Sequence, residues 1–446
     1  MLNYINKIYF LLSLILYFIF IPKVNDEYLM LHYINILSMF MYFALIYTTY
    51  TRKIDKFIKM SLFIKIFIYS IAFVSLYNLT SYFYTDNFFV FSYADARKYH
   101  NFGITMSSMS FFDGIDYLLT FWDFSDLGMP VLASLIYTFI QSNLMINFFY
   151  IFIGIFTAFG IFSISKNFMS HKYAFLGALS YSISSFVLFF HSTGLKERFM
   201  IMLVVLSFDQ YYKFINKKYI LNLIYGLIFI SLILFFRPIL IAFILLSIGI
   251  GYLIYKRKTI SAKIVFILIA LLFVLVAPTI FIIINRYLAG GFEFLVASRA
   301  SQGMVIGSVP FTYAVNILAQ AIGPLPTLLH DTNLLITIYA PGLIYRVLIA
   351  FPFWLGVIYI YKTKKYKIYP LLLFVLIEMF ALALVMEGLE LRKAMPHIPF
   401  VFIIAFWFLD QYDNKQIVFK RPKRFKQLFK VSLFLLALLI FYWNFR

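Results

Sequence analysis

A short polar stretch, residues 92–100, stands between two long blocks of almost purely apolar sequence. Its carboxylate, Asp95, is of the type that acts as a general base, and the neighbouring Arg97 and Lys98 are of the type that holds an anion. Tyr99 and His100 add groups that could hydrogen-bond or stack on a substrate. An ordinary solvated loop explains the same residues about equally well, so the rest of the chain has to decide between the two.

The composition indicates a membrane protein. Of the 446 residues, 63% are hydrophobic and 13% are charged, against roughly 45–50% and 25% in soluble domains. Apolar runs long enough to cross a bilayer as helices recur from end to end, and helices satisfy their own backbone groups in lipid. We therefore expect an all-α polytopic integral membrane protein with about 13 transmembrane helices, forming a single transmembrane domain over residues 1–446. The chain has no cysteine, which excludes disulfides and thiolate metal sites.

The net charge of +20 is distributed as a topology signal. Lys and Arg cluster in alternate connections between apolar runs, as the positive-inside rule requires. This pattern argues against a nucleic-acid partner and predicts a multi-pass membrane protein with its N-terminus in the cytoplasm. No small-residue cleavage site follows the first apolar run, so we expect that run to be a retained span. The basic connections are 52–59, 166–172, 213–218, 256–263, 362–367 and 415–430.

Two long connections are expected on the outer side. Residues 80–130 form the first large outer loop, which carries Asp95 and, over 111–124, an aromatic and acidic helix typical of the membrane interface. Residues 286–341 form a second outer segment, broken by Gly and Pro, which we expect to cap the site as a re-entrant or interfacial piece. The basic segment 415–430 is expected on the inner surface. The predicted spans are 8–21, 28–50, 61–79, 143–164, 173–192, 198–214, 219–236, 238–255, 264–285, 342–361, 368–386, 397–411 and 428–444.

This topology places most of the remaining ionisable residues on the outer face. Charge costs about 2.5–3.5 kcal/mol at mid-membrane and less at the edge, and long basic side chains at the edge could also be snorkelling to headgroups. Glu378 is the one acid expected deep in the membrane, either as a functional group or as a neutral acid bonded to a neighbouring helix. The candidate substrate-binding residues are Tyr99, His100, Lys196, Glu197, Arg198, Arg237, Arg299, Arg346, Arg392, Lys393 and His397.

One carboxylate with several guanidinium groups at the bilayer surface suits a substrate that combines a lipid tail, a phosphate and a hydroxyl acceptor. Arg and Lys would clamp the phosphate, and Asp95 would take the proton of the attacking hydroxyl. The lipid tail would need a groove between helices.

The motif order resembles bacterial membrane glycosyltransferases of the GT-C superfamily, the relatives of protein O-mannosyltransferases and of lipid A aminoarabinose transferases. The resemblance covers about residues 80–411 and rests on short motifs: Asp95-Ala96-x-x-Tyr99, Leu195-Lys196-Glu197 after a Ser-rich helix, Arg237-Pro238, and Leu391-Arg392-Lys393 followed by Pro396 and Pro399.

The resemblance implies a GT-C-like fold and an inverting transferase that uses a polyprenyl-phosphate-linked sugar at the outer leaflet, with Asp95 as base or acceptor-positioning carboxylate. Its acceptor would be a glycan, a lipid or a protein, and membrane lipids would surround it. No cofactor is expected; no adjacent Asp-Glu pair stands beside Asp95, and divalent metal use is left open. In the better-known relatives the aspartate loop follows the first span, whereas here about three spans precede it.

Two other functions fit parts of the sequence. An O-antigen or capsule polysaccharide polymerase is also polytopic and often depends on Arg residues in outer loops, a role that Arg286 and Arg299 could take. A lipid-linked glycan flippase or secondary transporter is a further alternative. Transporters tend to show internal repeats and helices broken at mid-membrane, and neither is evident in this sequence.

Overall fold

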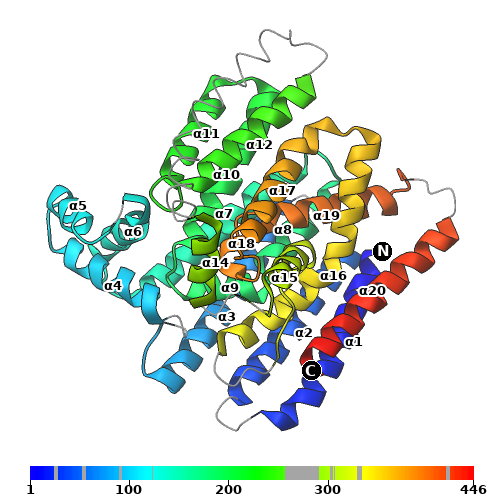
Figure 1. Cartoon of the computed structure of the whole chain (residues 1–446), viewed down its shortest axis with the longest axis horizontal. Coiled ribbons are helices and arrows are strands. Elements are labelled where there is room, and N and C mark those ends of the chain that lie inside the picture. The colour runs from blue at the N-terminus through cyan, green and yellow to red at the C-terminus, as the bar shows by residue number, and fades with distance from the viewer. Residues whose placement is uncertain are drawn as a thin grey trace.

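The computed structural model describes residues 1–24, 29–52, 57–89, 93–122, 124–256, 291–301, 305, 307–328, 334–417 and 422–445. Within these ranges the chain is helical and contains no strand. Figure 1 shows the helices packed as one bundle, with α4, α5 and α6 projecting from its side and the first and last helices, α1 and α20, lying next to each other. The predicted all-α fold is confirmed.

Eight described helical segments are long and apolar enough to cross a membrane, and a ninth span would be a pair of helices bent by 52°. The prediction of a polytopic membrane protein is therefore confirmed. The eight segments contain α1 (Leu2–Phe20), α2 (Leu29–Thr51), α3 (Ile58–Thr85), α7 (Asn143–Ser165), α12 (Ile239–Lys256), α16 (Leu334–Thr363), α17 (Tyr369–Leu384) and α20 (Pro422–Phe445); the bent pair is α8 (His171–Ser182) with α9 (Ser185–Ser192).

The difference from the expected 13 spans has a physical basis. Helix α10 (Glu197–Lys217) carries several charged residues. Helices α11 (Ile220–Ile233) and α19 (Ile398–Asp413) are shorter than the roughly 20 residues that cross the hydrocarbon core. The predicted span 264–285 lies outside the described residues. The count of 13 thus remains a prediction.

The centre of the bundle is formed by α8, α9 and α19. Every residue of α9 is buried, and so is nearly every residue of α8 and α19. These helices are apolar on all sides, which is typical of helices surrounded by others. Helices α7, α10 and α16 pack around them. The polar residues at the ends of these inner helices are therefore held on a rigid frame.

The first outer loop is built from three helices, α4 (Tyr93–Ser107), α5 (Phe111–Leu119) and α6 (Gly128–Tyr137), with a short 3-10 turn, η3 (Phe124–Asp126), before α6. The side chain of Ser110 caps α5, accepting from the backbone N–H of Asp113. The interfacial helix expected over 111–124 is thus shorter, and Phe112 on it is 78% exposed. Pro130, the predicted end of this segment, lies inside α6.

The second outer segment contains α14 (Gly291–Ser301) and α15 (Val309–Ile322), which ends at Gly323 with φ +106°. Pro341, the predicted end of this segment, lies inside α16, which begins at Leu334 and runs through that proline. Proline has no N–H and leaves the carbonyl four residues earlier unbonded. The Asn35 side chain donates to this carbonyl, Thr337 O, at 3.0 Å, so α2 completes the helix at the break.

Three of the basic connections, 166–172, 213–218 and 362–367, meet at one end of the bundle. Asn216 accepts from Lys367 at 2.7 Å and donates to Asn167 at 2.6 Å, and the N-terminal ammonium of Met1 lies 3.1 Å from Asp413. Of the basic segment 415–430, residues 422–430 form the first turns of α20. Helix α10 leads from this end to Glu197, about 30 Å away at 1.5 Å per residue.

Candidate functional site

Arg392 joins two carboxylates that come from distant parts of the chain. It lies in α18 (Leu391–Ala394), a single turn before α19. Its Nη1 donates to Asp95 Oδ2 at 2.6 Å, and its Nε donates to Glu197 Oε1. Burial alone would lower the pKa of the Arg392 guanidinium, but the charge of Glu197 and the hydrogen bonds to both carboxylates outweigh it and raise that pKa above its ordinary value.

Arg237 stands beside the same pair. Its Nη2 is 3.9 Å from Glu197 Oε1, and its Nη1 donates to the carbonyl of Lys393 at 3.4 Å. The Glu197 side chain is fully buried, whereas that of Arg237 is 20% exposed. The buried carboxylate of Glu197 therefore binds the guanidinium groups of Arg392 and Arg237, which are themselves partly exposed.

Lysine residues extend this arrangement on both sides. Lys196 pairs with Asp126 of the first outer loop, and Lys393 Nζ lies 2.6 Å from Glu387 Oε1 and 3.3 Å from Glu390 Oε2. The side chains that these contacts join are called the polar cluster below. Its members are Asp95, Asp126, Lys196, Glu197, Arg237, Glu387, Glu390, Arg392 and Lys393.

The turn that carries Arg392 and Lys393 is held by α15. Gly388 N donates to Asn316 Oδ1 at 2.5 Å, and Gln320 Nε2 donates to Gly388 O at 2.5 Å. A Cβ on Gly388 would stand 2.6 Å from the carbonyl oxygen of Asn316, so only glycine allows this approach. The second outer segment thus positions the turn.

The turn between α11 and α12 is fastened to the first outer loop. Gly128 N donates to Phe235 O at 2.9 Å, and the rings of Phe124 and Phe235 lie 4.8 Å apart. Arg237 follows directly, and the rigid φ of Pro238 at the start of α12 fixes the direction in which the chain leaves. The loop that carries Asp95 and the turn that carries Arg237 therefore form one unit.

The structure brings together five of the predicted site residues in the polar cluster besides Asp95: Lys196, Glu197, Arg237, Arg392 and Lys393. Several cluster side chains remain partly accessible, among them Asp95 at 40%, Arg392 at 32%, Lys393 at 28% and Arg237 at 20% exposed. A carboxylate and several cationic groups thus face one accessible surface, an arrangement that can take a proton and bind an anion.

Tyr99 and His100 lie on α4 but are turned into the protein. Tyr99 is buried, with its ring 5.5 Å from that of Trp122, and burial raises the pKa of its phenol. His100 Nδ1 is 2.6 Å from the hydroxyl of Tyr137 on α6. Both side chains pack α4 against the rest of the outer loop. Because Asp95 lies on the same helix, these contacts help to fix its position.

Three other predicted residues are occupied in buried contacts. Arg299 on α14 pairs with Glu387 and donates to Val385 O at 3.1 Å. Arg346 on α16 donates to Ile322 O at 3.2 Å, where the carbonyl end of α15 favours a cation. His397 lies 3.5 Å from Glu378, and both are buried.

Arg198 also points inward. It is fully buried at the start of α10, beside His191 of α9, and is separated from the accessible face that its neighbours Lys196 and Glu197 serve. Consecutive residues on a helix do not share a face, which is why this one run of charges divides between the cluster and the interior.

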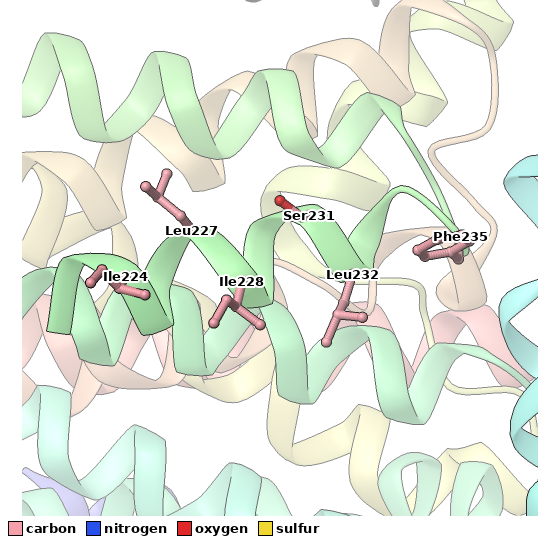
Figure 2. Close-up of a pocket in the computed structure, with 6 residues that line it drawn as sticks. All are labelled: Ile224, Leu227, Ile228, Ser231, Leu232 and Phe235. Carbon is pink, nitrogen blue, oxygen red and sulfur yellow. The ribbon is translucent and has the colours of Figure 1, made fainter. Parts of the chain in front are cut away.

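A shallow apolar groove of about 320 Å³ runs along α11 and includes Phe235, just beyond the end of that helix. Figure 2 shows its lining from Ile224 at one end to Phe235 at the other. Phe235 is two residues from Arg237, so the end of the groove and the guanidinium are adjacent in the chain. The full lining is Ile224, Leu227, Ile228, Ser231, Leu232 and Phe235.

Several residues of the site were not among the sequence candidates. Asp126 and Glu387 complete ion pairs of the cluster, and Asn316 and Gln320 hold the turn. Glu387 lies four residues before the motif Leu391-Arg392-Lys393, and Asp126 lies in the first large outer loop. Their positions could therefore have identified them as candidates. Nothing in the sequence around Asn316 and Gln320 indicated a role in the site. Comparisons of the chain with protein-family models, with curated proteins and with solved structures found no match.

Proposed function

We propose that the protein is a membrane glycosyltransferase that moves a sugar from a polyprenyl-phosphate donor to a hydroxyl of an acceptor. The observation that carries this proposal is the pairing of Arg392 with both Asp95 and Glu197. Asp95, Glu197 and Arg392 each belong to a different one of the four motifs on which the GT-C resemblance rests. Arg237, from the fourth motif, lies 3.9 Å from Glu197.

Each group has a role in the proposed reaction. Asp95 accepts the proton of the acceptor hydroxyl, and the hydroxyl oxygen bonds to the anomeric carbon of the donor sugar. The bond from that carbon to the phosphate oxygen breaks, and the lipid phosphate leaves with the bonding electrons, which inverts the configuration. Arg237 and Lys393 neutralise the charge that develops on the leaving phosphate, while Arg392 orients Asp95.

The groove on α11 gives the lipid a place consistent with these roles. Its walls are apolar, and a chain lying along it from Ile224 to Phe235 would bring its phosphate to Arg237. Partly exposed cations at the end of an apolar groove match a ligand with an oily tail and an anionic head. In this proposal the cluster faces the outer side of a bacterial inner membrane, because the basic connections 166–172, 213–218 and 362–367 meet at the opposite end of α10.

The alternatives receive less support. A polymerase that relied on Arg299 would need that side chain free, whereas it is paired with Glu387 and bonded to Val385 O; Arg286 lies outside the described residues. A flippase or secondary transporter would place its ionisable groups along a path at mid-membrane, whereas the polar cluster gathers at one end of α10. A transport function would have to rely on Glu378 and His397, which form a buried ionisable pair.

The proposal is tested with membrane vesicles supplied with an outward-facing lipid-linked sugar donor. Asp95→Asn should abolish sugar transfer. Asp113→Asn is the matched control, because Asp113 lies in the same loop but bonds only locally with Ser110, and it should keep normal transfer. Full activity of the Asp95 variant would remove the catalytic assignment. Mass spectrometry of lipid-linked glycans in a deletion strain distinguishes a glycosyltransferase from a polysaccharide polymerase. Intact repeat units without long chains would support the polymerase.

A further inference from the structure

A guanidinium group is fully buried inside the helix bundle. Arg198 is the second residue of α10 and is 0% exposed. Throughout the described part of the chain, nothing accepts a hydrogen bond from its Nε, Nη1 or Nη2. His191 in the last turn of α9 is also 0% exposed, and both of its ring nitrogens are unpartnered in the same sense.

These two side chains meet at one point beside α7. The position that a Cβ on Gly154 would occupy is 2.4 Å from His191 Nε2 and 2.7 Å from Arg198 Nη2. The two nitrogens are therefore close to each other. They can approach the backbone of α7 because residue 154 is a glycine and has no side chain. Tyr181 of α8 stabilises the charged guanidinium electrostatically and through its hydroxyl, which has no partner with full hydrogen-bond geometry among the described residues.

The electrostatics of this place require an anion. Removing a charged group from water without a partner costs several kcal/mol, and arginine is almost never fully buried unless paired. Glu197 is the adjacent acid; its Oε1 is bonded to Arg392, and its buried Oε2 accepts no hydrogen bond from Arg198 or any other described residue, because neighbouring residues of a helix do not face each other. The N-terminal end of α10 adds further positive potential.

The chemistry of the unpartnered groups is that of donors. A guanidinium only donates, an imidazole can donate, and a tyrosine hydroxyl can donate as well. Donor groups from α8, α9 and α10 thus lie close together beside Gly154. No carboxylate among the described residues forms a hydrogen bond with them. The full burial of these side chains excludes a large or lipid-linked ligand.

We propose that Arg198, with His191 and Tyr181, binds a small monovalent inorganic anion, chloride being the test case, inside the helix bundle. The anion neutralises the buried guanidinium and ties α10 to α8 and α9 behind the polar cluster. This site is distinct from the accessible cations Arg237 and Lys393, and it stands whether or not the protein transfers sugars.

Thermal unfolding of the full-length protein in detergent tests the inference. Chloride is titrated against gluconate at constant ionic strength. The wild-type unfolding temperature should rise with chloride and then level off, since a ligand that binds only the folded state stabilises it by mass action. Arg198→Gln should show no rise, and in gluconate it should unfold at or above the wild-type temperature because the unneutralised charge is gone. Arg424→Gln, on the exposed face of α20, should keep the wild-type dependence.

Equilibrium dialysis of the wild-type protein with radioactive chloride gives an independent readout. One ion per chain should bind to the wild type, and to His191→Gln with a several-fold weaker affinity. These two measurements keep the inference testable if Arg198→Gln does not fold. Absence of bound chloride in the wild type, or an Arg198→Gln protein that still responds to chloride, would overturn it.

Discussion

Arg392 and Asp95, 297 positions apart in the sequence, are joined by a hydrogen bond of 2.6 Å between Nη1 and Oδ2. The bond links the first turn of α4 in the outer loop to the short helix α18. Arg392 can hold Asp95 and Glu197 at once because a guanidinium offers several donors in a fixed plane.

Arg392→Lys should therefore impair activity although it preserves the charge. A lysine ammonium is a point charge on a flexible stem and does not reproduce the planar fork, so Asp95 would lose its fixed position. We expect sugar transfer in vesicles to fall about 100-fold, the scale of a small misplacement at a reacting centre. Arg424→Lys on α20 is the control and should leave the rate unchanged; an Arg392→Lys enzyme with the wild-type rate would contradict the positioning role.

Glu197→Gln should lower stability strongly. Glu197 is fully buried and faces the guanidinium groups of Arg392 and Arg237. Removing one partner of a buried ion pair leaves the other charge uncompensated, which costs about 3–5 kcal/mol. Denaturation of the protein in mixed detergent micelles measures this free energy of unfolding. Glu390→Gln is the matched control: that acid is 34% exposed and pairs with Lys393 at 3.3 Å, so its loss should cost at most about 1 kcal/mol.

The sequence was sufficient for the helical class and for much of the cluster, for a physical reason. Hydrophobic runs and the asymmetry of basic residues specify which connections lie at the same end of a bundle. Lys196, Glu197, Arg237 and Arg392 each stand next to a helix start, so an error of a few residues in a boundary does not move them to the other end.

The direction in which a side chain points could not be predicted in the same way. Arg198 and Lys196 occupy the same short run of charges, yet one is buried and the other pairs with the outer loop. Arg346 was expected to meet substrate but donates to the end of α15 instead. These outcomes depend on helix rotation and on contacts between distant segments, and neither leaves a local trace in the sequence.

Gly128→Ala should loosen the connection between the outer loop and the α11–α12 turn. A Cβ at this position would stand 2.6 Å from the ring of Phe236, and such overpacking typically costs about 1–3 kcal/mol. Thermal unfolding in detergent measures the loss. Gly226→Ala offers the opposite case within α11, because its Cβ would meet nothing closer than 3.5 Å. Alanine is favoured over glycine inside a helix, so this variant should gain about 0.5–1 kcal/mol.

The break at Pro341 can be tested with a double-mutant cycle. Asn35→Ala should lower the free energy of unfolding by about 1–3 kcal/mol, because the carbonyl of Thr337 would lose the buried side-chain hydrogen bond from Asn35. In a Pro341→Ala background the restored N–H can bond to that carbonyl, so the same Asn35 substitution should cost clearly less. Equal costs in the two backgrounds would show that Asn35 does not compensate for the proline.

Acidification should destabilise the outer loop through His100. Burial lowers the pKa of this imidazole, and Nδ1 is bonded to Tyr137 in the folded protein. The unfolded chain takes up a proton near pH 6.5, whereas the folded chain resists it. Stability is therefore complete above that pH and falls as the pH drops below it towards the folded pKa.

His100→Gln should remove this contribution. The fall in unfolding temperature between about pH 7.5 and 5.5, the range in which histidine titrates, should be smaller in the variant than in the wild type. His171→Gln changes an exposed ring at the start of α8 and should retain the wild-type fall. If both variants respond to acid as the wild type does, the acid-sensitive contact is not the one between α4 and α6. If only His100→Gln is resistant, the support that holds the helix of Asp95 depends on a neutral imidazole.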